Sequence, residues 1–467
     1  MNESIVNSLS VNLPPELEKL KGAGFFKEFK TKAEYHLKRS DLPQIVKDRI
    51  LLEIHNNELL EEFYIMDEKD VIKGIAKYIP GFKKKDLEKI QGDLDYIFVE
   101  GKKKYAECTI SSLFKGSPLI LKWKGNTYPQ GEADESAIAI DMMRERGKAT
   151  VTADVEMTCT VSKKSATGEK LTVHLPYPSP HGGGMSAIKL ISSSGKAEIA
   201  PASSPQRTAC FKVSGDKQNQ FSVRFTFKNT QTYMSYKDLL KASKNATPAK
   251  EMILRKQVKP ADLEEKAPHY VFTPFIQALS EKIVGKTKNK TEIARKIYDY
   301  ITHEYHYSFV RDYAAIESLA EYFALRGRGD CGLQASLLIT LMRYNGIPAR
   351  WESGICTDGD NGGMHDWAEV YFEGVGFRPV DPSVGGGERR RGKTKASAEE
   401  NCEFYFGNMD PYRLIFNTDI QEPFNPPKKQ YRRDPYDNQC GEAETAKKML
   451  SGNEVRFRRI VHSTELE

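Results

Sequence analysis

The sequence contains no long run of apolar residues. No stretch approaches the ~18 consecutive apolar residues of a membrane-spanning helix, so we expect no membrane span. Residues 1–7 have neither a basic start nor an apolar core, so the sequence also predicts no secretory signal. Both absences favour a protein of the cytoplasm.

Cysteine is scarce, and no two cysteines form a C-x-x-C pair. The seven cysteines stand singly, at Cys108, Cys159, Cys210, Cys331, Cys356, Cys402 and Cys440. This pattern argues against a zinc cage and against a disulfide scaffold, and it is typical of a reducing cytoplasm. We expect no metal and no cofactor.

Neither sign of charge dominates. The chain has 70 basic and 64 acidic residues, a net charge of +6. That excess is too small for the basic surface of a nucleic-acid-binding protein, so no nucleic-acid partner is expected. Short basic runs at 83–85, 102–104 and 389–395 are interpreted as solvated surface.

The patterns along the chain predict several domains. At 467 residues the chain is too long for one hydrophobic core. Apolar residues at helical spacing predict a helical N-terminal region over 1–107. Alternating apolar and polar residues, as in 151–161, predict an immunoglobulin-like β-sandwich over 130–238. The fold class is therefore a multidomain α+β protein.

The second half of the chain is predicted to hold a further α+β domain at 271–430. A lysine-rich segment broken by prolines, 239–270, is interpreted as a linker to it. Residues 431–467 are interpreted as a C-terminal tail. Within the domain, the glycine- and arginine-rich segment 385–391 looks too polar to pack, and we expect a mobile loop there.

Cys331 stands at the predicted start of a helix, because leucine and methionine recur at helical spacing over 333–342. A thiol in that position feels the positive end of the helix dipole and unpaired backbone amides. We expect these to lower its pKa and to offer an oxyanion hole. Gly329 and Gly332 should leave room for a substrate at the sulfur. The alternative is an inert buried thiol, the commoner fate of a cysteine.

Two later residues can complete a relay with this thiol. His365 begins a strand predicted over 365–372, and Asp381 ends a return strand over 377–381. Asp381 can orient the imidazole of His365 through one ring nitrogen, so that the other nitrogen faces Cys331. A histidine or an aspartate alone at such a place is more often structural; the order of all three favours acyl transfer.

The register of the predicted hairpin tests this geometry. His365 and Asp381 share a face only if the connection around 373–376 has an odd residue count or contains a bulge. Gly374 or Gly376 could adopt the left-handed conformation of a bulge, and we predict a bulge there.

Other residues are weighed against the relay. Glu369 is a rival partner for the histidine but lies about 13 Å along the strand, too far for contact. Tyr305 or Tyr307 could supply a hydroxyl to an oxyanion, although both are more often core residues as parts of a strand. The acidic stretch 358–361 lacks the spaced glutamate of a calcium loop and is interpreted as a turn.

Taken together, these motifs resemble the transglutaminase-like superfamily, whose fold is similar to that of papain-type peptidases. The stretches that carry the resemblance are 328–335 (RGDCGLQA), 341–350 (LMRYNGIPAR), 365–371 (HDWAEVY) and 379–383 (PVDPS). The resemblance covers about 270–430. It implies Cys331 as nucleophile, His365 as acid and base, and Asp381 as its orienting partner.

The leading hypothesis is cysteine-dependent hydrolysis of peptide or protein amides through a thioester. Transfer to an amine is the second hypothesis. Animal transglutaminases place a tryptophan shortly upstream of the cysteine, and none of Trp123, Trp351 and Trp367 lies there. A third hypothesis is a protein-binding role with a relic triad. The substrate and the oligomeric state are left open.

Overall fold

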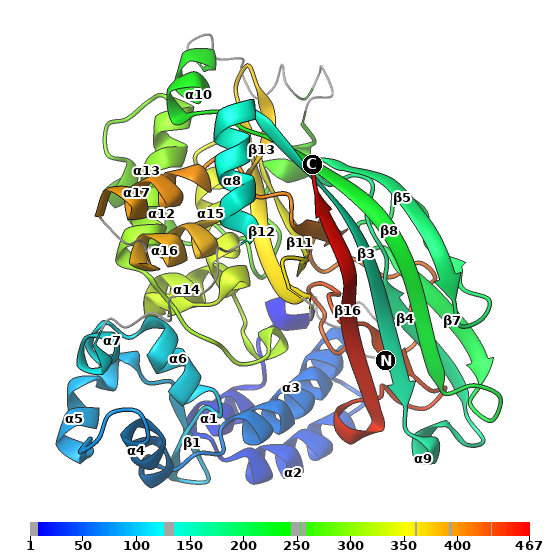
Figure 1. Ribbon diagram of the computed structural model, residues 1–467. Helices are drawn as coiled ribbons and strands as arrows, with labels where there is room; N and C mark the ends of the chain where they lie inside the picture. The colour runs from blue at the N-terminus through cyan, green and yellow to red at the C-terminus, as the bar shows by residue number, and fades with distance from the viewer. Residues whose placement is uncertain are drawn as a thin grey trace.

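The chain forms a multidomain arrangement of helices and sheets, as the sequence predicts. The computed structural model describes residues 8–125, 135–243, 253, 258–359, 362–391, 395–430 and 432–467. A helical region at the N-terminus lies below a core of helices around a sheet, and two curved sheets flank that core (Figure 1).

The N-terminal region is built from short helices and one hairpin. The helices are α1 (Pro15–Ala23), α2 (Phe26–Leu37), α3 (Gln44–Phe63), α4 (Glu68–Ala76), α5 (Lys84–Lys89), η2 (Gln91–Asp93), α6 (Thr109–Gly116) and α7 (Pro118–Lys124). Strands β1 (Tyr96–Val99) and β2 (Lys102–Tyr105) pair antiparallel. Apolar residues of α4, α5 and α6 enclose a small core of their own, including Val71, Leu87 and Leu113.

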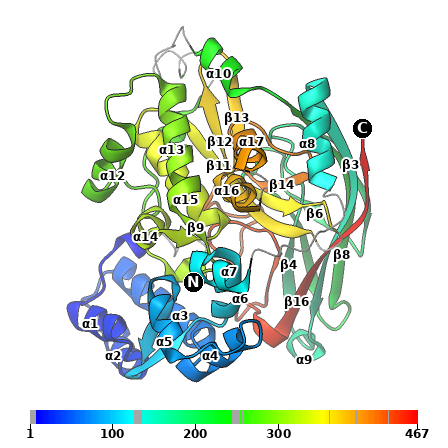
Figure 2. The ribbon, with the colours of Figure 1, turned by 60° about the vertical axis from the view of Figure 1, so that its left-hand side comes forward.

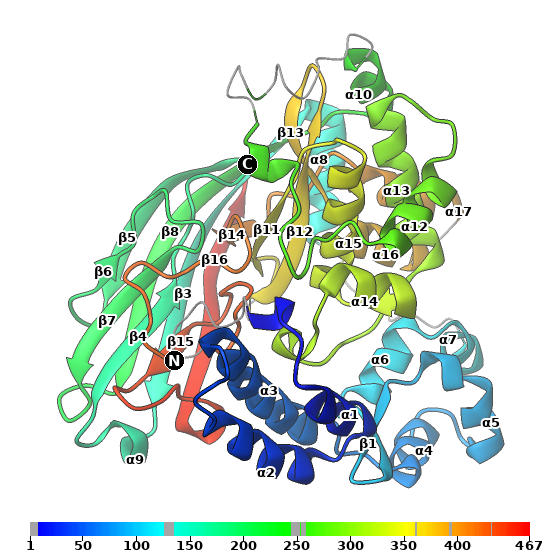
Figure 3. The same ribbon diagram turned by 180° about the vertical axis from the view of Figure 1, so that it is seen from behind.

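Ion pairs and polar contacts attach this region to the rest of the chain. The guanidinium of Arg49, 2% exposed, contacts both Glu53 at 3.1 Å and Glu317 at 2.6 Å. Arg326 pairs with Asp95 at 2.6 Å. The N-terminal helices therefore contact the segment that leads toward Cys331 (Figure 3).

Two four-stranded antiparallel sheets enclose a second core. One has the order β16-β3-β8-β5 and the other β15-β4-β7-β6. Their bounds are β3 (Lys148–Val161), β4 (Lys170–Pro176), β5 (Met185–Ser193), β6 (Glu198–Ile199), β7 (Thr208–Ser214), β8 (Gln220–Thr232), β15 (Glu442–Glu444) and β16 (Val455–Leu466). Every second residue of β3 is buried from Ala149 on, which is the predicted alternation. Side chains such as Val155, Phe211 and Phe225 join both sheets in one cluster.

The end of the chain takes part in both sheets. The segment interpreted as a tail supplies β15, which pairs with β4, and β16, which pairs with β3 from Val455 to Leu466. Helices α8 (Glu135–Arg146) and α9 (Lys163–Ala166) flank β3. The residue pattern within 431–467 could not predict this strand pairing, because β3, the partner of β16, lies about three hundred residues earlier in the chain.

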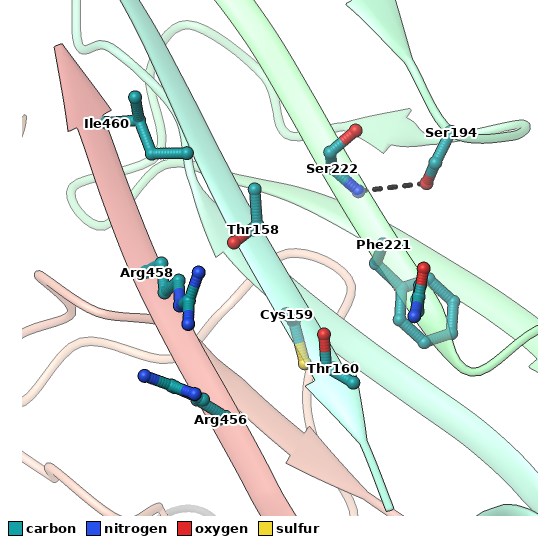
Figure 4. Close-up of a pocket in the computed structure, with 10 residues that line it drawn as sticks. Thr158, Cys159, Thr160, Ser194, Phe221, Ser222, Arg456, Arg458 and Ile460 are labelled. Carbon is teal, nitrogen blue, oxygen red and sulfur yellow. Dashed lines mark hydrogen bonds between the residues drawn. The ribbon is translucent and has the colours of Figure 1, made fainter.

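A shallow hollow of about 590 Å³ lies on the outer face of the β16-β3-β8-β5 sheet. Hydroxyl and guanidinium groups line much of it, among them Thr158, Thr160, Ser222, Arg456 and Arg458 (Figure 4). None of the residues singled out in the sequence for chemistry lies in this hollow.

The core carries the motifs. Its sheet has the order β13-β12-β11-β14. Its strands are β11 (Ala349–Cys356), β12 (Gly363–Phe372), β13 (Gly376–Val380) and β14 (Arg413–Asn417), with the short pair β9 (His306–Tyr307) and β10 (Arg328–Gly329). Its helices are α10 (Tyr236–Ala242), α12 (Pro274–Val284), α13 (Lys290–Glu304), α14 (Leu319–Arg326), α15 (Cys331–Tyr344), α16 (Pro382–Arg391) and α17 (Lys395–Phe404). Short turns of 3₁₀ helix are η3 (Pro260–Asp262), η4 (Tyr313–Ala315) and η5 (Gly452–Glu454).

Helix α15 is the centre of this core. All of its residues from Cys331 to Arg343 are buried, with α12, α13 and α14 on one side and β11 and β12 on the other (Figure 2). A helix that is apolar all round must be surrounded, so its N-terminus is held in place by the whole domain.

The expectation of a mobile loop over 385–391 is wrong, because these residues belong to α16. A Cβ at Gly385 would lie 1.8 Å from the Tyr298 hydroxyl oxygen. The glycine therefore lets α16 pack closely against α13, and its place in a polar run concealed that role. Among the residues that the structure describes, no helix is long and apolar enough to cross a membrane.

Candidate active site

Cys331 is the first residue of α15, so the predicted helix start is confirmed. Asp330 caps the helix: its Oδ1 accepts the backbone N–H of Leu333 at 3.2 Å and the hydroxyl of Tyr313 at 2.7 Å. Cys331 as a residue is 9% exposed. The helix geometry therefore presents the sulfur at an N-terminus, where unpaired backbone amides remain.

The pKa of Cys331 departs from the expectation. Burial raises it well above the usual value, and the nearby charges of Asp366 and Asp330 raise it further. The thiol donates a hydrogen bond to Asp366 Oδ2 at 3.2 Å. The prediction of a lowered pKa was wrong, because the helix terminus was visible in the sequence, whereas the burial of the thiol and the approach of Asp366 were not.

The two glycines around the cysteine do not leave open space. A Cβ at Gly332 would lie 2.1 Å from the Tyr313 hydroxyl oxygen, and one at Gly329 would lie 2.8 Å from the Phe323 ring. The glycines permit these aromatic side chains to pack against the start of α15. The expectation that they leave room for a substrate is therefore wrong.

His365 and Asp381 lie together. The imidazole Nε2 is 2.7 Å from Asp381 Oδ2, and the ring stacks on Trp367 with centroids 5.9 Å apart. Asp381 is 0% exposed, and its other oxygen accepts the N–H of Val384 at 2.9 Å, which caps α16. One carboxylate thus orients the imidazole and begins a helix.

The charge of Asp381 is stabilised by its neighbours. Burial alone would raise the pKa of this carboxyl, but the charge and hydrogen bond of His365 and the charge of Arg413 outweigh it. The pKa therefore lies below its usual value. Arg413 Nη1 lies 3.6 Å from Asp381 Oδ2. Asp381 is an anion at neutral pH.

The hairpin has the odd connection that the geometry required. Strands β12 and β13 pair regularly from Ala368–Val380 to Phe372–Gly376, which leaves the residues 373–375 as the loop. Gly374 has φ +75° and Gly376 φ +108°, both in the left-handed region. The register thus places Asp381 across from Trp367, on the face of His365. The predicted bulge within the ladder is not present, since an odd loop suffices.

The structure places the thiol of Cys331 beside β12, the strand of His365. The thiol lies against Asp366, however, and not against His365 as expected. Its hydrogen bond goes to Asp366, and no bond between Cys331 and His365 is found among the described residues. Gln439 joins the two strand residues, because its Nε2 donates to the His365 carbonyl at 2.9 Å and to Asp366 Oδ1 at 2.5 Å.

The sequence interpretation missed Asp366 and Gln439. Neighbouring strand residues normally point to opposite faces, so no signal placed Asp366 at the thiol together with His365. Gln439 comes 73 residues after Asp366. The sequence shows only that Gln439 follows the predicted domain, and nothing in it indicates a contact with the site.

Buried carboxyl groups surround this side of the site. Burial raises the pKa of Asp366 well above its usual value, and the charges of Asp437, Asp330 and Asp434 add to the rise. Burial likewise raises the pKa of Asp330, to about 6. The charge of Arg432 acts in the opposite direction on Asp434 and Asp437. The cluster therefore retains protons at a pH where exposed carboxyls have lost them.

The other candidates have separate partners. Tyr305 is a core residue whose hydroxyl donates to the Ala324 carbonyl at 3.2 Å. Tyr307 lies on β9 beside Gly329, and burial together with the charges of Cys331, Asp330 and Asp366 raises its pKa. Glu369 pairs with Arg350 Nε at 2.7 Å, which agrees with its exclusion from the relay.

Asp360 and Asn361, part of the acidic stretch considered for calcium, lie outside the described residues. Within the ranges that the structure describes, no three His, Cys, Asp or Glu side chains are placed to hold a metal ion together.

Comparison with known proteins identifies the core. The sequence profile of the Transglutaminase-like superfamily matches residues 277–382, a range that contains Cys331, His365 and Asp381. This part of the chain is a transglutaminase-like core. No curated protein matches the chain.

Several solved structures are similar to parts of the chain. A candidate cysteine protease from Cytophaga hutchinsonii has 16% identity and a TM-score of 0.39, covering 68% of this chain and 90% of its own. The periplasmic domain of TgpA from Pseudomonas aeruginosa has 13% identity and a TM-score of 0.28, covering 56% and 96%. A candidate protease from Parabacteroides distasonis has 11% identity and a TM-score of 0.20, covering 52% and 64%. The family assignment rests on the profile match.

Proposed function

We propose that this protein is a cysteine-dependent enzyme that cleaves or transfers acyl groups of peptide or protein amides. Cys331 is the nucleophile, His365 the proton-transfer group and Asp381 its orienting partner. The observation that carries the proposal is the 2.7 Å bond between His365 and Asp381, on a strand that packs against the helix begun by Cys331. The profile match over 277–382 supports it.

The chemistry follows from these placements. A thiolate at Cys331 attacks an amide carbonyl, and the tetrahedral oxyanion needs hydrogen-bond donors. Of the first-turn amides of α15, that of Leu333 is already bonded to Asp330, so the remaining donors are those nearest the sulfur. The imidazole of His365 protonates the leaving amine, and water or another amine then takes the acyl group from the thioester.

Hydrolysis is the outcome that we favour. None of Trp123, Trp351 and Trp367 closely precedes Cys331, so the upstream tryptophan of the cross-linking enzymes has no counterpart here. Trp351 and Trp367 are both fully buried. Transfer to an amine remains the alternative fate of the same thioester.

An electrophilic amide probe tests the proposal. The full chain should form a covalent adduct at Cys331 that mass spectrometry locates, and Cys331→Ala should form none. A peptide substrate incubated with and without a primary amine then separates the two outcomes: hydrolysis gives the free acid in both, and transfer gives the amine conjugate. A protein that labels equally on its other cysteines, and turns over no peptide, would contradict the proposal.

The burial of the thiol favours a second candidate, a protein-binding role in which the triad is a relic. A buried cysteine with a raised thiol pKa is what an inert cysteine shows. In this case Cys331→Ala would leave every cellular effect of the protein unchanged, whereas the enzymatic proposal requires those effects to be lost.

We also propose that the other regions are accessory domains: a helical region at 1–107, an immunoglobulin-like sandwich at 130–238 closed by β15 and β16, and a connection at 239–270 to the domain at 271–430. Limited proteolysis should cut first between these units. Because β16 pairs with β3 along its length, the C-terminal residues should resist digestion as long as the sandwich does.

A further inference from the structure

The hollow on the outer face of the β16-β3-β8-β5 sheet is crossed by two rows of polar side chains (Figure 4). Each row has an arginine of β16 at one end, a threonine of β3 in the middle and a polar residue of β8 at the other end. The first row is Arg456, Thr160 and Gln220, and the second is Arg458, Thr158 and Ser222. Every second residue of a strand faces the same way, so the two guanidiniums share one face. The hollow therefore presents two cations and several hydroxyl groups.

No partner for the two guanidiniums is found in the part of the chain that the structure describes. Both arginines are exposed, and none of the residues that line the hollow is acidic. The next two carboxylates on this face of β3 are engaged elsewhere: Glu156 contacts His462 at 3.1 Å, and Asp154 binds Arg224 at 2.8 Å. A concave surface lined by one sign of charge attracts ligands of the opposite sign. The hollow is thus complementary to an anion.

The spacing of the two arginines fits an extended peptide. Arg456 and Arg458 are two residues apart on a strand, which separates their Cα atoms by about 6.6 Å. Acidic side chains at every second position of an extended peptide recur at the same interval. Each guanidinium can bind one carboxylate through two parallel N–H···O bonds. The threonine and serine hydroxyls can donate to carbonyl groups of the same peptide.

Other anionic partners fit this surface less well. Single-stranded nucleic acids need exposed aromatic side chains on which their bases stack. Phe221, the aromatic residue that lines the hollow, is 2% exposed and packs in the core between the two sheets. The polar groups of the hollow are spread over three strands instead of converging on one point, which favours a chain of anions over a single phosphate group.

The strand that carries the two arginines also contacts the candidate active site. Its next residue, Arg459, donates from Nε to the carbonyl of Gly362 at 2.8 Å, directly before the strand of His365. Arg459 Nη1 lies 2.8 Å from Cys440 Sγ. Cys440 follows Gln439, whose amide donates to the His365 carbonyl at 2.9 Å. Because β16 contacts both segments that meet at His365, one polypeptide substrate can reach the hollow and the thiol together.

We propose that the hollow binds an acidic segment of the protein substrate, with carboxylates of alternate residues paired to Arg456 and Arg458. This assignment rests on the proposed acyl-transfer function. It gives the substrate a chemical class, a protein with an acidic run near the amide that Cys331 attacks. The two sheets thereby select the substrate, and the core carries out the reaction.

Fluorescence anisotropy of a labelled peptide tests the hollow without any turnover. The probe is a short peptide of alternating glutamate and serine, and the protein is the full chain with Cys331→Ala, so that the probe is not cleaved. Arg456→Gln and Arg458→Gln should each weaken binding by about threefold, and the double variant by about tenfold. Arg146→Gln is the matched control, because it removes an exposed guanidinium of α8 at the far end of β3. It should change the affinity by less than about 1.5-fold.

Changes in the peptide keep the test decisive if an arginine variant fails to fold. Replacing every glutamate of the probe by glutamine should weaken binding by more than about tenfold. Moving the glutamates to every third position should weaken it by about threefold, because successive carboxylates of an extended peptide then face opposite ways. A glutamine peptide that binds as well as the glutamate peptide, or a double variant that binds unchanged, would overturn the assignment. Tighter binding of a phosphoserine peptide or of inorganic phosphate would overturn it as well.

Turnover separates this proposal from the function on which it rests. The double variant should raise KM about tenfold more for a substrate with an acidic run than for the same substrate with glutamines. An equal change of KM for both substrates would sink the link between the hollow and the substrate. If the amide probe forms no adduct while the acidic peptide binds as expected, the acyl-transfer function is wrong and the acidic-peptide site stands. If the adduct forms while the acidic peptide does not bind, the function stands and the site is wrong.

Discussion

Each oxygen of Asp381 has its own hydrogen-bond partner, and a single substitution can separate the contributions of the two bonds. Oδ2 is bonded to His365 at 2.7 Å, and Oδ1 caps α16 through the N–H of Val384 at 2.9 Å. Asparagine caps a helix about as well as aspartate. Asp381→Asn should therefore keep the cap and lose the anion that orients the imidazole, whereas Asp381→Ala loses both.

The magnitudes differ enough to measure. A hydrogen bond to a charged group contributes about 1.5–3 kcal/mol, and an N-cap about 1 kcal/mol. We expect the free energy of unfolding to fall by about 2 kcal/mol in Asp381→Asn and by about 3 kcal/mol in Asp381→Ala. Turnover of a peptide substrate should fall by about 10⁴-fold in both, as when the orienting aspartate of a triad is replaced by asparagine.

The assays are denaturant unfolding and turnover on the same preparations. Asp67→Ala is the matched control, because Asp67 caps α4 in the N-terminal region. It should lower the stability by about 1 kcal/mol and leave turnover unchanged. An Asp381→Asn protein that folds and turns over substrate at the unchanged rate would refute the role of this carboxylate.

Three further predictions concern stability. Because the folded-state pKa of Asp330 is raised from 3.8 to about 6, its stabilising contribution is complete below pH 3.8 and is lost as the pH rises through about 6. The free energy of unfolding should therefore be about 1.4 kcal/mol larger at pH 5 than at pH 8, and Asp330→Asn should reduce that difference. Gly385→Ala should lower the free energy of unfolding by about 1–3 kcal/mol, because the added Cβ clashes with Tyr298. Gly92→Ala, whose Cβ would meet no atom within 4 Å, should lower it by less than about 0.5 kcal/mol. Equal shifts of the melting temperature in the two variants would contradict the packing argument. Arg49→Met removes a buried guanidinium that pairs with Glu53 and Glu317, leaves Glu53 with Lys21 alone, and should lower the free energy of unfolding by about 3 kcal/mol. Lys30→Met at an exposed pair should lower it by about 0.5 kcal/mol, and calorimetry would show whether the two differ.

The parts of the site that depend on nearby residues could be predicted from the sequence. Apolar spacing over 333–342 located the start of α15 at Cys331, because helix periodicity and capping are local. Strand alternation gave the condition that His365 and Asp381 share a face only across an odd connection or a bulge, and the structure has the odd connection where a bulge was predicted. Both inferences needed only a few neighbouring residues.

Predictions failed where contacts join distant parts of the chain. The pKa of Cys331 is raised first by burial and then by the charge of Asp366, and no pattern in the sequence shows that burial or that Asp366 turns toward the thiol. The 385–391 segment was misjudged because its glycine packs against Tyr298, 87 residues earlier by number. Composition indicates the structure of a segment in isolation, whereas contacts with distant residues determine the structure of this one.

The difference between local patterns and contacts of distant residues also bears on the chemistry of the site. A relay inferred from the order of Cys331, His365 and Asp381 assigns the thiol proton to the imidazole, because these are the residues that a motif shows. The hydrogen bond of the thiol goes instead to a carboxyl held by Gln439, from a segment outside the profile match. The contacts at the sulfur are thus set in part by a segment that no motif includes, whereas the role of His365 rests on its own pairing with Asp381.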